Sequence, residues 1–297
     1  MVQQPTLSNW LHLTLLGIVW GGTFMVISIA LEGYGPITVA CARTTLGAIA
    51  LFGVMLVLRT PWPKRQTFRY LVLGGLFSTV IPFMLLSWGL QYTPSAFGGV
   101  SMMSVPLFVL PIAHYFADEK LTRRRTIGVV IGFAGAILLI GPEALKIGDG
   151  IVLLAQLACL GAALCYAISS IQMRNCPPID PLALATFTLA VGSIVLLPTM
   201  LVFEGIPNWQ GLRPSGAILV LGFLPTALAA FIRINLIRSA GAVFMTLVNY
   251  QVPLWSVLFG AVLLSEPLPG SLFAAMSLIF AGLFISQFGT FKRTFFS

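Results

Sequence analysis

The sequence predicts an all-α integral membrane protein of ten transmembrane helices, arranged as two five-helix inverted repeats with both termini in the cytoplasm. Three observations predict this fold: few charges, apolar runs of membrane-spanning length, and an internal repeat. The 297 residues include only 16 Lys and Arg and 8 Asp and Glu, while 58% are hydrophobic. Soluble domains carry roughly a quarter charged residues. Despite a net charge of +8, this composition excludes a soluble enzyme, a disordered chain and a nucleic-acid-binding protein.

Charge-free runs mark the spans, since a helical crossing needs about 20 mostly apolar residues. One uncharged stretch, Tyr70–Ala117, is too long for a single helix, and the polar break at 91–95 divides it into a hairpin. The apolar runs are continuous, so strands are not expected. The predicted helices are Trp10–Ala30, Pro36–Leu58, Tyr70–Leu90, Ala96–Phe116, Thr126–Ile140, Gly150–Ile171, Pro181–Phe203, Ser215–Ile237, Ala242–Leu264 and Ser271–Gly289.

The positions of the basic residues predict the orientation, because cytoplasmic loops are enriched in Lys and Arg. With a cytoplasmic N-terminus, twelve basic residues fall in inward loops or ends and two, Lys146 and Arg213, fall outside. Arg43 and Arg233 lie within spans. This distribution favours an even number of helices in the cytoplasmic membrane, with both ends inside.

The chain repeats itself. A shift of 147 residues aligns Gly75–Gly135 with Gly222–Gly282 without gaps and with 11 identities in 61 positions. A shift of 145 aligns Pro36–Val57 with Pro181–Val202, with 8 identities in 22. Each half, 1–142 and 147–297, contains five predicted helices. Because five is odd, the second half enters the membrane from the opposite side, an arrangement typical of secondary transporters.

Several short motifs extend over the whole chain. The first predicted helix contains the run 17–24, Gly-Ile-Val-Trp-Gly-Gly-Thr-Phe, and the second contains Arg43. The fourth and ninth end in the related runs 118–121 and 265–268. Together with the glycines of the last helix in each half, these motifs resemble the EamA-type branch of the drug/metabolite transporter superfamily. The resemblance implies a ten-helix carrier that exports small metabolites, most similar to aromatic and broad-specificity amino-acid exporters.

Pro106 and Pro253 occupy equivalent mid-helix positions in the two repeats. A proline inside a helix removes one backbone hydrogen bond, here from the carbonyls of Met102 and Asn249. Such carbonyls face a wet cavity or find another partner. We therefore interpret both prolines either as hinges beside a substrate cavity or as packing kinks. Ser101 and Tyr250 lie at a similar depth and are further candidates for the cavity.

Arg43 lies seven residues into the second predicted helix, about 10 Å below the outer boundary. An intramembrane arginine is costly and is by default a functional candidate. The sequence leaves two interpretations open: a gate or substrate contact, or a structural arginine that extends toward the outer headgroups or caps the carbonyls of a neighbouring helix.

Four more residues are candidates for the cavity because they are polar or amphipathic and lie deep in spans: Trp20, Trp88, Tyr166 and Ser169. Core packing is the alternative for each of them. All eight acidic residues map to loops or helix ends. The absence of a mid-membrane carboxylate argues against lipophilic cations and favours a zwitterionic or neutral substrate.

No cofactor, metal site or catalytic motif is expected, since the four cysteines show no paired spacing and no nucleotide-binding loop occurs. The sequence therefore favours a non-enzymatic, monomeric transporter in the lipid bilayer, with amino acids or similar small molecules as substrates. Export of other small solutes or drugs, or a passive pore, is the alternative.

Overall fold

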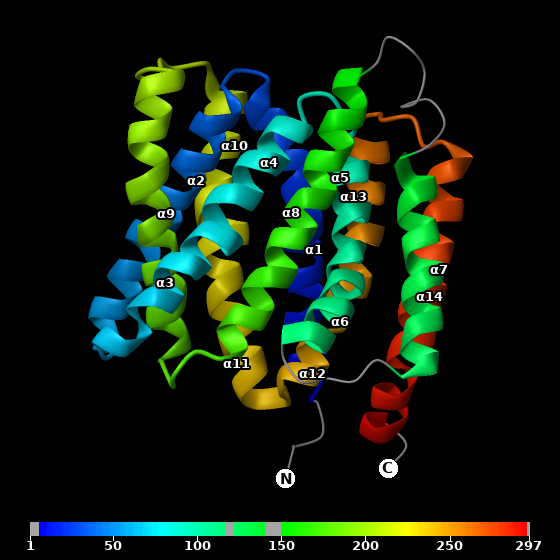
Figure 1. Ribbon diagram of the computed structural model, residues 1–297. Helices are drawn as coiled ribbons and strands as arrows, with labels where there is room; N and C mark the ends of the chain where they lie inside the picture. Colours follow the sequence, from blue (N-terminus) through cyan, green and yellow to red (C-terminus); the bar gives the residue numbers. More distant parts are fainter. Residues whose placement is uncertain (1–5, 117–121, 141–149, 296–297) are drawn as a thin grey trace.

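The computed structural model describes residues 6–116, 122–140 and 150–295, and every regular element in these residues is helical. This confirms the predicted all-α class. The helices stand side by side in one bundle, and α1 (Leu7–Leu31) begins at the same end of the bundle as that at which α14 (Gly270–Phe295) ends (Figure 1). The other elements are α2 (Pro36–Val57), η1 (Arg65–Thr67), α3 (Phe68–Gly75), η2 (Leu76–Val80), α4 (Ile81–Gly89), α5 (Ser95–Ser101), η3 (Met102–Ser104), α6 (Val105–Phe116), α7 (Arg123–Ile140), α8 (Gly150–Arg174), α9 (Pro181–Phe203), α10 (Leu212–Leu221), η5 (Gly222–Leu228), α11 (Ala229–Ala240), α12 (Ala242–Met245) and α13 (Val248–Leu263).

Most of these elements belong to helical stretches that are long enough to span a membrane. Among the described residues, seven helical stretches are long and apolar enough to cross a bilayer: Leu7–Leu31, Pro36–Val57, Arg65–Gly89, Ser95–Phe116, Gly150–Arg174, Pro181–Phe203 and Leu212–Ala240. Val248–Leu263 and Gly270–Ser286 are shorter apolar helices. The protein is therefore a multi-pass membrane protein, and the count of ten spans stays a prediction.

Two of the long stretches contain a π-helical turn, η2 in the first half and η5 in the second. The shift of 147 residues places η2 within η5, so the two turns occupy equivalent positions of the repeat. In η5, Pro225 has no N–H to donate to the Leu221 carbonyl, and the hydroxyl of Thr226 donates to that carbonyl instead, at 2.7 Å. π-Helical turns are rare in proteins, and those that occur are often at functional sites.

The two helices with equivalent prolines are both irregular. A 3₁₀ turn, η3, precedes Pro106, and within it the N–H of Val105 donates to the carbonyl of Met102. Of the two predicted outcomes for this carbonyl, another partner or a wet cavity, the tighter turn supplies another partner. The ninth predicted helix, Ala242–Leu264, is also interrupted, since α12 ends at Met245 and α13 begins at Val248.

Glycines set the closest helix contacts. On α7, Gly128 approaches α14 so closely that a Cβ on it would lie 2.5 Å from the carbonyl oxygen of Gly282. On α1, a Cβ on Gly17 would lie 2.6 Å from Oε1 of Gln251 on α13. Small residues permit such approach in membrane helices, where packing rather than the hydrophobic effect holds helices together. The glycines at these positions therefore serve helix packing.

Two carboxylates cap helices that begin at the upper end of the bundle in Figure 1. Glu204, at the end of α9, accepts hydrogen bonds from the N–H groups of Ile37 and Thr38 at 2.9 and 2.7 Å and from the Thr38 hydroxyl at 2.7 Å. Glu266, after α13, accepts from Ser95 and Ala96 at the start of α5. A negative charge satisfies the free N–H groups and the dipole at a helix N-terminus. Both acids therefore act as structural caps, in agreement with their predicted place at helix ends.

Candidate functional site

Arg43 lies inside the helix bundle. Only 4% of the residue is exposed, so other helices of the bundle enclose its side chain. Its guanidinium carbon lies 3.8 Å from the centre of the Phe83 ring on α4. Its Nη2 donates to the hydroxyl of Thr226 in η5 at 3.5 Å, a long hydrogen bond. Arg43 thus joins α2, α4 and the π-helical turn of the second half.

The same turn holds Trp20, another predicted cavity residue. The indole N–H of Trp20 on α1 donates to the carbonyl of Pro225 at 3.2 Å, and the side chain is half-buried. Since Pro225 and Thr226 are consecutive, η5 brings Trp20 and Arg43 to neighbouring positions. A polar atom on a buried tryptophan needs such a partner.

Tyr166 of α8 completes this group. The half-buried ring packs against the main hydrophobic core and also against a smaller cluster that includes Phe83. Ser169, one turn further along α8, is buried, and the neighbouring Ser170 hydroxyl donates to the Tyr166 carbonyl at 2.9 Å. We refer to Trp20, Arg43, Phe83, Tyr166 and Thr226 as the arginine cluster.

The predicted residues of the fourth helix lie in a different environment. Ser101 is fully buried, and its hydroxyl donates to the carbonyl of Gly98 at 2.7 Å. Met102 is half-buried and packs against the main core, next to Pro106 in the following helix. The hydroxyl of Ser104 is buried without a hydrogen-bond partner among the described residues.

The predicted residues of the ninth helix fall in the first turn of α13. Asn249 is exposed, whereas Tyr250 is half-buried and stacks on Phe280 of α14, with ring centres 6.0 Å apart and planes at 16°. Pro253 is buried one turn later. Trp88 is at the end of α4 and contacts Tyr92, with ring centres 5.6 Å apart. The structure therefore joins Trp20, Arg43 and Tyr166, whereas Ser101 bonds to the Gly98 carbonyl, Trp88 contacts Tyr92 and Tyr250 stacks on Phe280.

Three members of the contact network were absent from the candidates proposed from the sequence: Phe83, Pro225 and Thr226. The internal repeat contains a signal for one of them, because Thr79 and Thr226 are identical across the shift of 147 residues. Thr226 packs against Gly47, whose Cβ would lie 2.5 Å from the threonine methyl group. Thr79 packs against Gly192 in the same way, at 2.7 Å. Gly47 and Gly192 are themselves equivalent across the shift of 145.

The acids that the structure describes lie at helix ends, as predicted. Glu32 pairs with Arg213 at 3.0 Å, and Asp180 pairs with Arg238 at 3.0 Å. Glu204 and Glu266 are the caps described above. The other four acids, Asp118, Glu119, Glu143 and Asp149, are outside the described residues. Within the described ranges, His, Cys, Asp and Glu form no group of three that could hold a metal ion.

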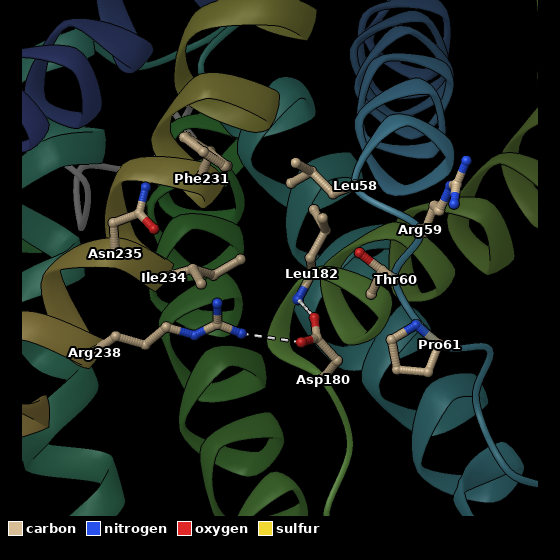
Figure 2. A pocket seen from close by; sticks show the side chains of 10 residues that line it. All are labelled: Leu58, Arg59, Thr60, Pro61, Asp180, Leu182, Phe231, Ile234, Asn235 and Arg238. Carbon is tan, nitrogen blue, oxygen red and sulfur yellow. Dashed lines mark hydrogen bonds and ion pairs between the residues drawn. The ribbon is translucent and has the colours of Figure 1, made fainter.

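A small cavity of about 220 Å³ opens where α2 ends, α9 begins and α11 ends (Figure 2). Asp180 is part of the cavity wall. One of its carboxylate oxygens accepts a hydrogen bond from the N–H of Leu182, and the other pairs with Arg238. Its lining consists of Leu58, Arg59, Thr60, Pro61, Asp180, Leu182, Phe231, Ile234, Asn235 and Arg238. None of the residues predicted for the substrate cavity lines it.

The fold and these contacts define a polytopic α-helical membrane protein with an arginine cluster inside the bundle. Residues 9–141 and 153–288 each match the EamA-like transporter family. The chain belongs to this family. The family is described as one of transporters, in agreement with the resemblance stated above.

Curated relatives are similar over nearly the whole chain. The uncharacterized transporter YoaV of Bacillus subtilis is 26% identical over 284 residues, which cover 93% of this chain and 95% of the relative. The uncharacterized inner membrane transporter YedA of Escherichia coli is 28% identical, over 85% of this chain and 82% of the relative. A probable amino-acid metabolite efflux pump of Salmonella typhimurium is 26% identical, over 93% of each.

A solved crystal structure shares the fold. It aligns with a TM-score of 0.64 over 97% of this chain and 99% of the other, at 21% sequence identity.

Proposed function

We propose that this protein is a secondary transporter that exports small metabolites, with amino acids as the first substrate class, across the cytoplasmic membrane by alternating access. The observation that carries the proposal is that the EamA-like transporter family matches the chain twice, at 9–141 and at 153–288. Two related units in one chain are the arrangement from which alternating-access carriers are built. The Escherichia coli relative YedA is described as an inner membrane transporter, which supports the cytoplasmic membrane as the location of this protein.

The two units, 1–142 and 147–297, are proposed to be inverted repeats of five helices each. Equivalent features support this: η2 matches η5, and the contact of Gly47 with Thr226 matches that of Gly192 with Thr79. In each contact, a glycine of one half meets a threonine of the other. Such exchange is expected when a twofold axis relates the halves, and rocking about that axis would open the site to either side.

The proposed substrate site lies between the halves and includes the arginine cluster. Trp20, Arg43 and Tyr166 belong to it, with Trp88, Ser101, Met102, Ser169, Asn249 and Tyr250 as further contacts reached during the transport cycle, and with Pro106 and Pro253 as hinges. The observation in favour is that η5 connects Trp20 of α1 with Arg43 of α2 through consecutive residues. A movement of η5 would therefore change both contacts at once.

Amino acids are the favoured substrates for two reasons. First, no acid of the described residues lies inside the bundle away from a helix end, so an organic cation would lack a counter-charge there. Second, the Salmonella typhimurium relative is described as a probable amino-acid metabolite efflux pump. A zwitterion needs both an anion-binding and a cation-binding contact, and arginine and aromatic faces supply these.

The direct test is efflux from proteoliposomes that contain the purified protein and are preloaded with labelled amino acids. We expect efflux above that of empty liposomes, saturation with substrate, and counterflow when unlabelled substrate is placed outside. No flux of any amino acid would overturn the substrate assignment. Flux without saturation or counterflow would favour the pore.

A further inference from the structure

Arg43 is a buried cation whose hydrogen-bonding capacity is only partly used. It is 4% exposed. Among the described residues, Arg43 makes one hydrogen bond, the long one from Nη2 to the Thr226 hydroxyl, and its Nε is buried without an acceptor. Buried polar groups are nearly always paired, so an exception calls for an explanation.

The charge of Arg43 is also uncompensated within the described part of the chain. The described carboxylates are engaged elsewhere: Glu32 and Asp180 in ion pairs with other arginines, and Glu204 and Glu266 on helix N-termini. Apolar residues pack around Phe83, among them Ala40, Cys41, Val80, Leu196 and Met200. A buried charge in such surroundings is costly unless an anion is present for at least part of the protein's cycle.

The guanidinium keeps an unpaired donor at its edge, the N–H of Nε. The ring of Phe83 covers one face of the group, at 3.8 Å. Carboxylates bind arginine in the plane of the guanidinium, through two parallel N–H···O bonds at its edge. Stacking on an aromatic ring and bidentate pairing therefore use different parts of the same side chain.

We propose that Arg43 is the carboxylate receptor of the transport site, and that the protein selects substrates bearing a carboxylate group, held at the guanidinium edge that includes Nε. This inference rests on the proposed function. It narrows the substrate class to carboxylates and excludes amines that lack that group. Tyr166, packed against the same cluster, would lie beside the bound carboxylate.

The test uses three compounds of one shape: L-phenylalanine, phenethylamine, which lacks the carboxylate, and 3-phenylpropionate, which lacks the ammonium. Thermal stabilisation of the purified full-length protein, with sodium chloride as the anion control, reports binding without transport. We expect L-phenylalanine and 3-phenylpropionate to stabilise the wild-type protein, and phenethylamine and chloride to have no effect. Stabilisation by phenethylamine equal to that by L-phenylalanine, or equal stabilisation by chloride, would overturn the proposal without any mutation.

Substitution of the arginine then assigns the site. In R43Q, we expect the affinity for 3-phenylpropionate to fall at least tenfold, and in R43K to fall less, because lysine keeps the charge but not the paired donors. The control R213Q removes an exposed arginine and should bind like wild type. If R43Q folds and keeps its carboxylate preference, the proposal is wrong. If R43Q does not fold, the proposal is tested by the affinity of R43K for 3-phenylpropionate and by the binding of the three compounds to the wild-type protein.

The proposed transport function and the proposed role of Arg43 as carboxylate receptor can be disproved independently of each other. Amino-acid efflux that remains equally selective in R43Q would overturn the carboxylate receptor and leave the transport function. Arg43-dependent stabilisation by carboxylates without flux of any amino acid would overturn the substrate assignment and leave the receptor.

Discussion

Gly47 of α2 lies directly against Thr226 of η5, so close that a Cβ on the glycine would come within 2.5 Å of the threonine methyl group. The same pair of residue types recurs between Gly192 of α9 and Thr79 of η2. Each contact joins a helix of one half to the π-helical turn of the other. Close contacts at both turns mean that neither half can move without sliding past the other at these two points.

Alanine at Gly47 should therefore disturb both stability and transport. The added methyl group meets Thr226, and overpacking of this kind typically costs 1–3 kcal/mol, on the order of a few degrees in melting temperature. We expect Gly192→Ala to behave alike, because its Cβ would meet Thr79 and Thr44 at 2.7 and 2.8 Å. Thermal unfolding in detergent and proteoliposome flux measure the two effects. Gly53→Ala is the matched control on α2, since nothing lies within 4 Å of its Cβ, and a loss there equal to that at Gly47 would refute the steric explanation.

Replacing Glu204 by alanine should loosen the start of α2. The carboxylate accepts three hydrogen bonds there, and loss of a helix cap costs about 0.5–2 kcal/mol. We expect a lower melting temperature for Glu204→Ala and a smaller decrease for Glu204→Gln, which keeps one acceptor oxygen. Glu32→Gln removes one member of an exposed ion pair, for which about 0–1 kcal/mol is expected. Equal melting temperatures for Glu204→Ala and wild type would show that the cap is dispensable.

Trp20→Phe should reduce transport while the protein still folds. The phenyl ring retains most of the apolar contact, but the N–H bond to the Pro225 carbonyl at 3.2 Å is lost, at a cost of roughly 1 kcal/mol. Initial efflux rates, normalised to the amount of reconstituted protein, provide the measurement. Trp209→Phe serves as the control because Trp209 is exposed. A Trp20→Phe rate equal to that of the control would remove Trp20 from the proposed site.

Asn249→Ala should impair transport without lowering stability, because Asn249 is exposed and its loss leaves no cavity. Tyr250→Phe should keep the stacking on Phe280, whereas Tyr250→Ala should lose this stacking and lower both stability and transport. Flux and thermal unfolding of the three variants, measured side by side, separate these effects. Wild-type flux in Asn249→Ala and Tyr250→Ala would remove α13 from the substrate site.

Cys176 provides a test of sidedness in the unmodified sequence. It follows α8 and is partly exposed, whereas Cys41, Cys159 and Cys165 are buried within helices. Burial raises the pKa of the Cys176 thiol. Since maleimides react with the thiolate, labelling at neutral pH should be slower than that of a free thiol and should accelerate as the pH rises through the raised pKa. We expect label in inverted membrane vesicles only, and none in Cys176→Ser; label from the outer face alone would reverse the predicted topology.

The sequence was sufficient for the helical class because each span is a continuous apolar run bounded by charge or by proline, a signal that depends on local residues alone. It also placed an irregularity near Pro106, whereas α13 continues through Pro253. The 3₁₀ turn before Pro106 was not predicted, because a continuous apolar run does not show where the backbone tightens. In this turn the N–H of Val105 satisfies the Met102 carbonyl. The break at residues 246–247 gave no signal, because both residues suit an apolar helix.

The arginine cluster could not be predicted because it depends on packing between remote segments. Arg43 was a candidate from its depth alone, but its orientation is set by Phe83 on α4 and Thr226 on η5. Phe83 is one of 22 phenylalanines, so nothing in its sequence context distinguished it. The bond from Trp20 requires a carbonyl that becomes available next to the Pro225 turn, and such a turn is visible only once the backbone is folded.

The caps formed by Glu204 and Glu266 have a consequence for the order of events in a transport cycle. Both acids belong to the second half, both helices that they cap belong to the first, and both contacts lie at the same end of the bundle. At the opposite end, the Asp180–Arg238 pair joins two helices of the second half to each other. With the orientation that the basic residues predict, the capped end faces outward. We expect the empty carrier to rest with its outer entrance sealed, so that substrate loads from the cytoplasm first.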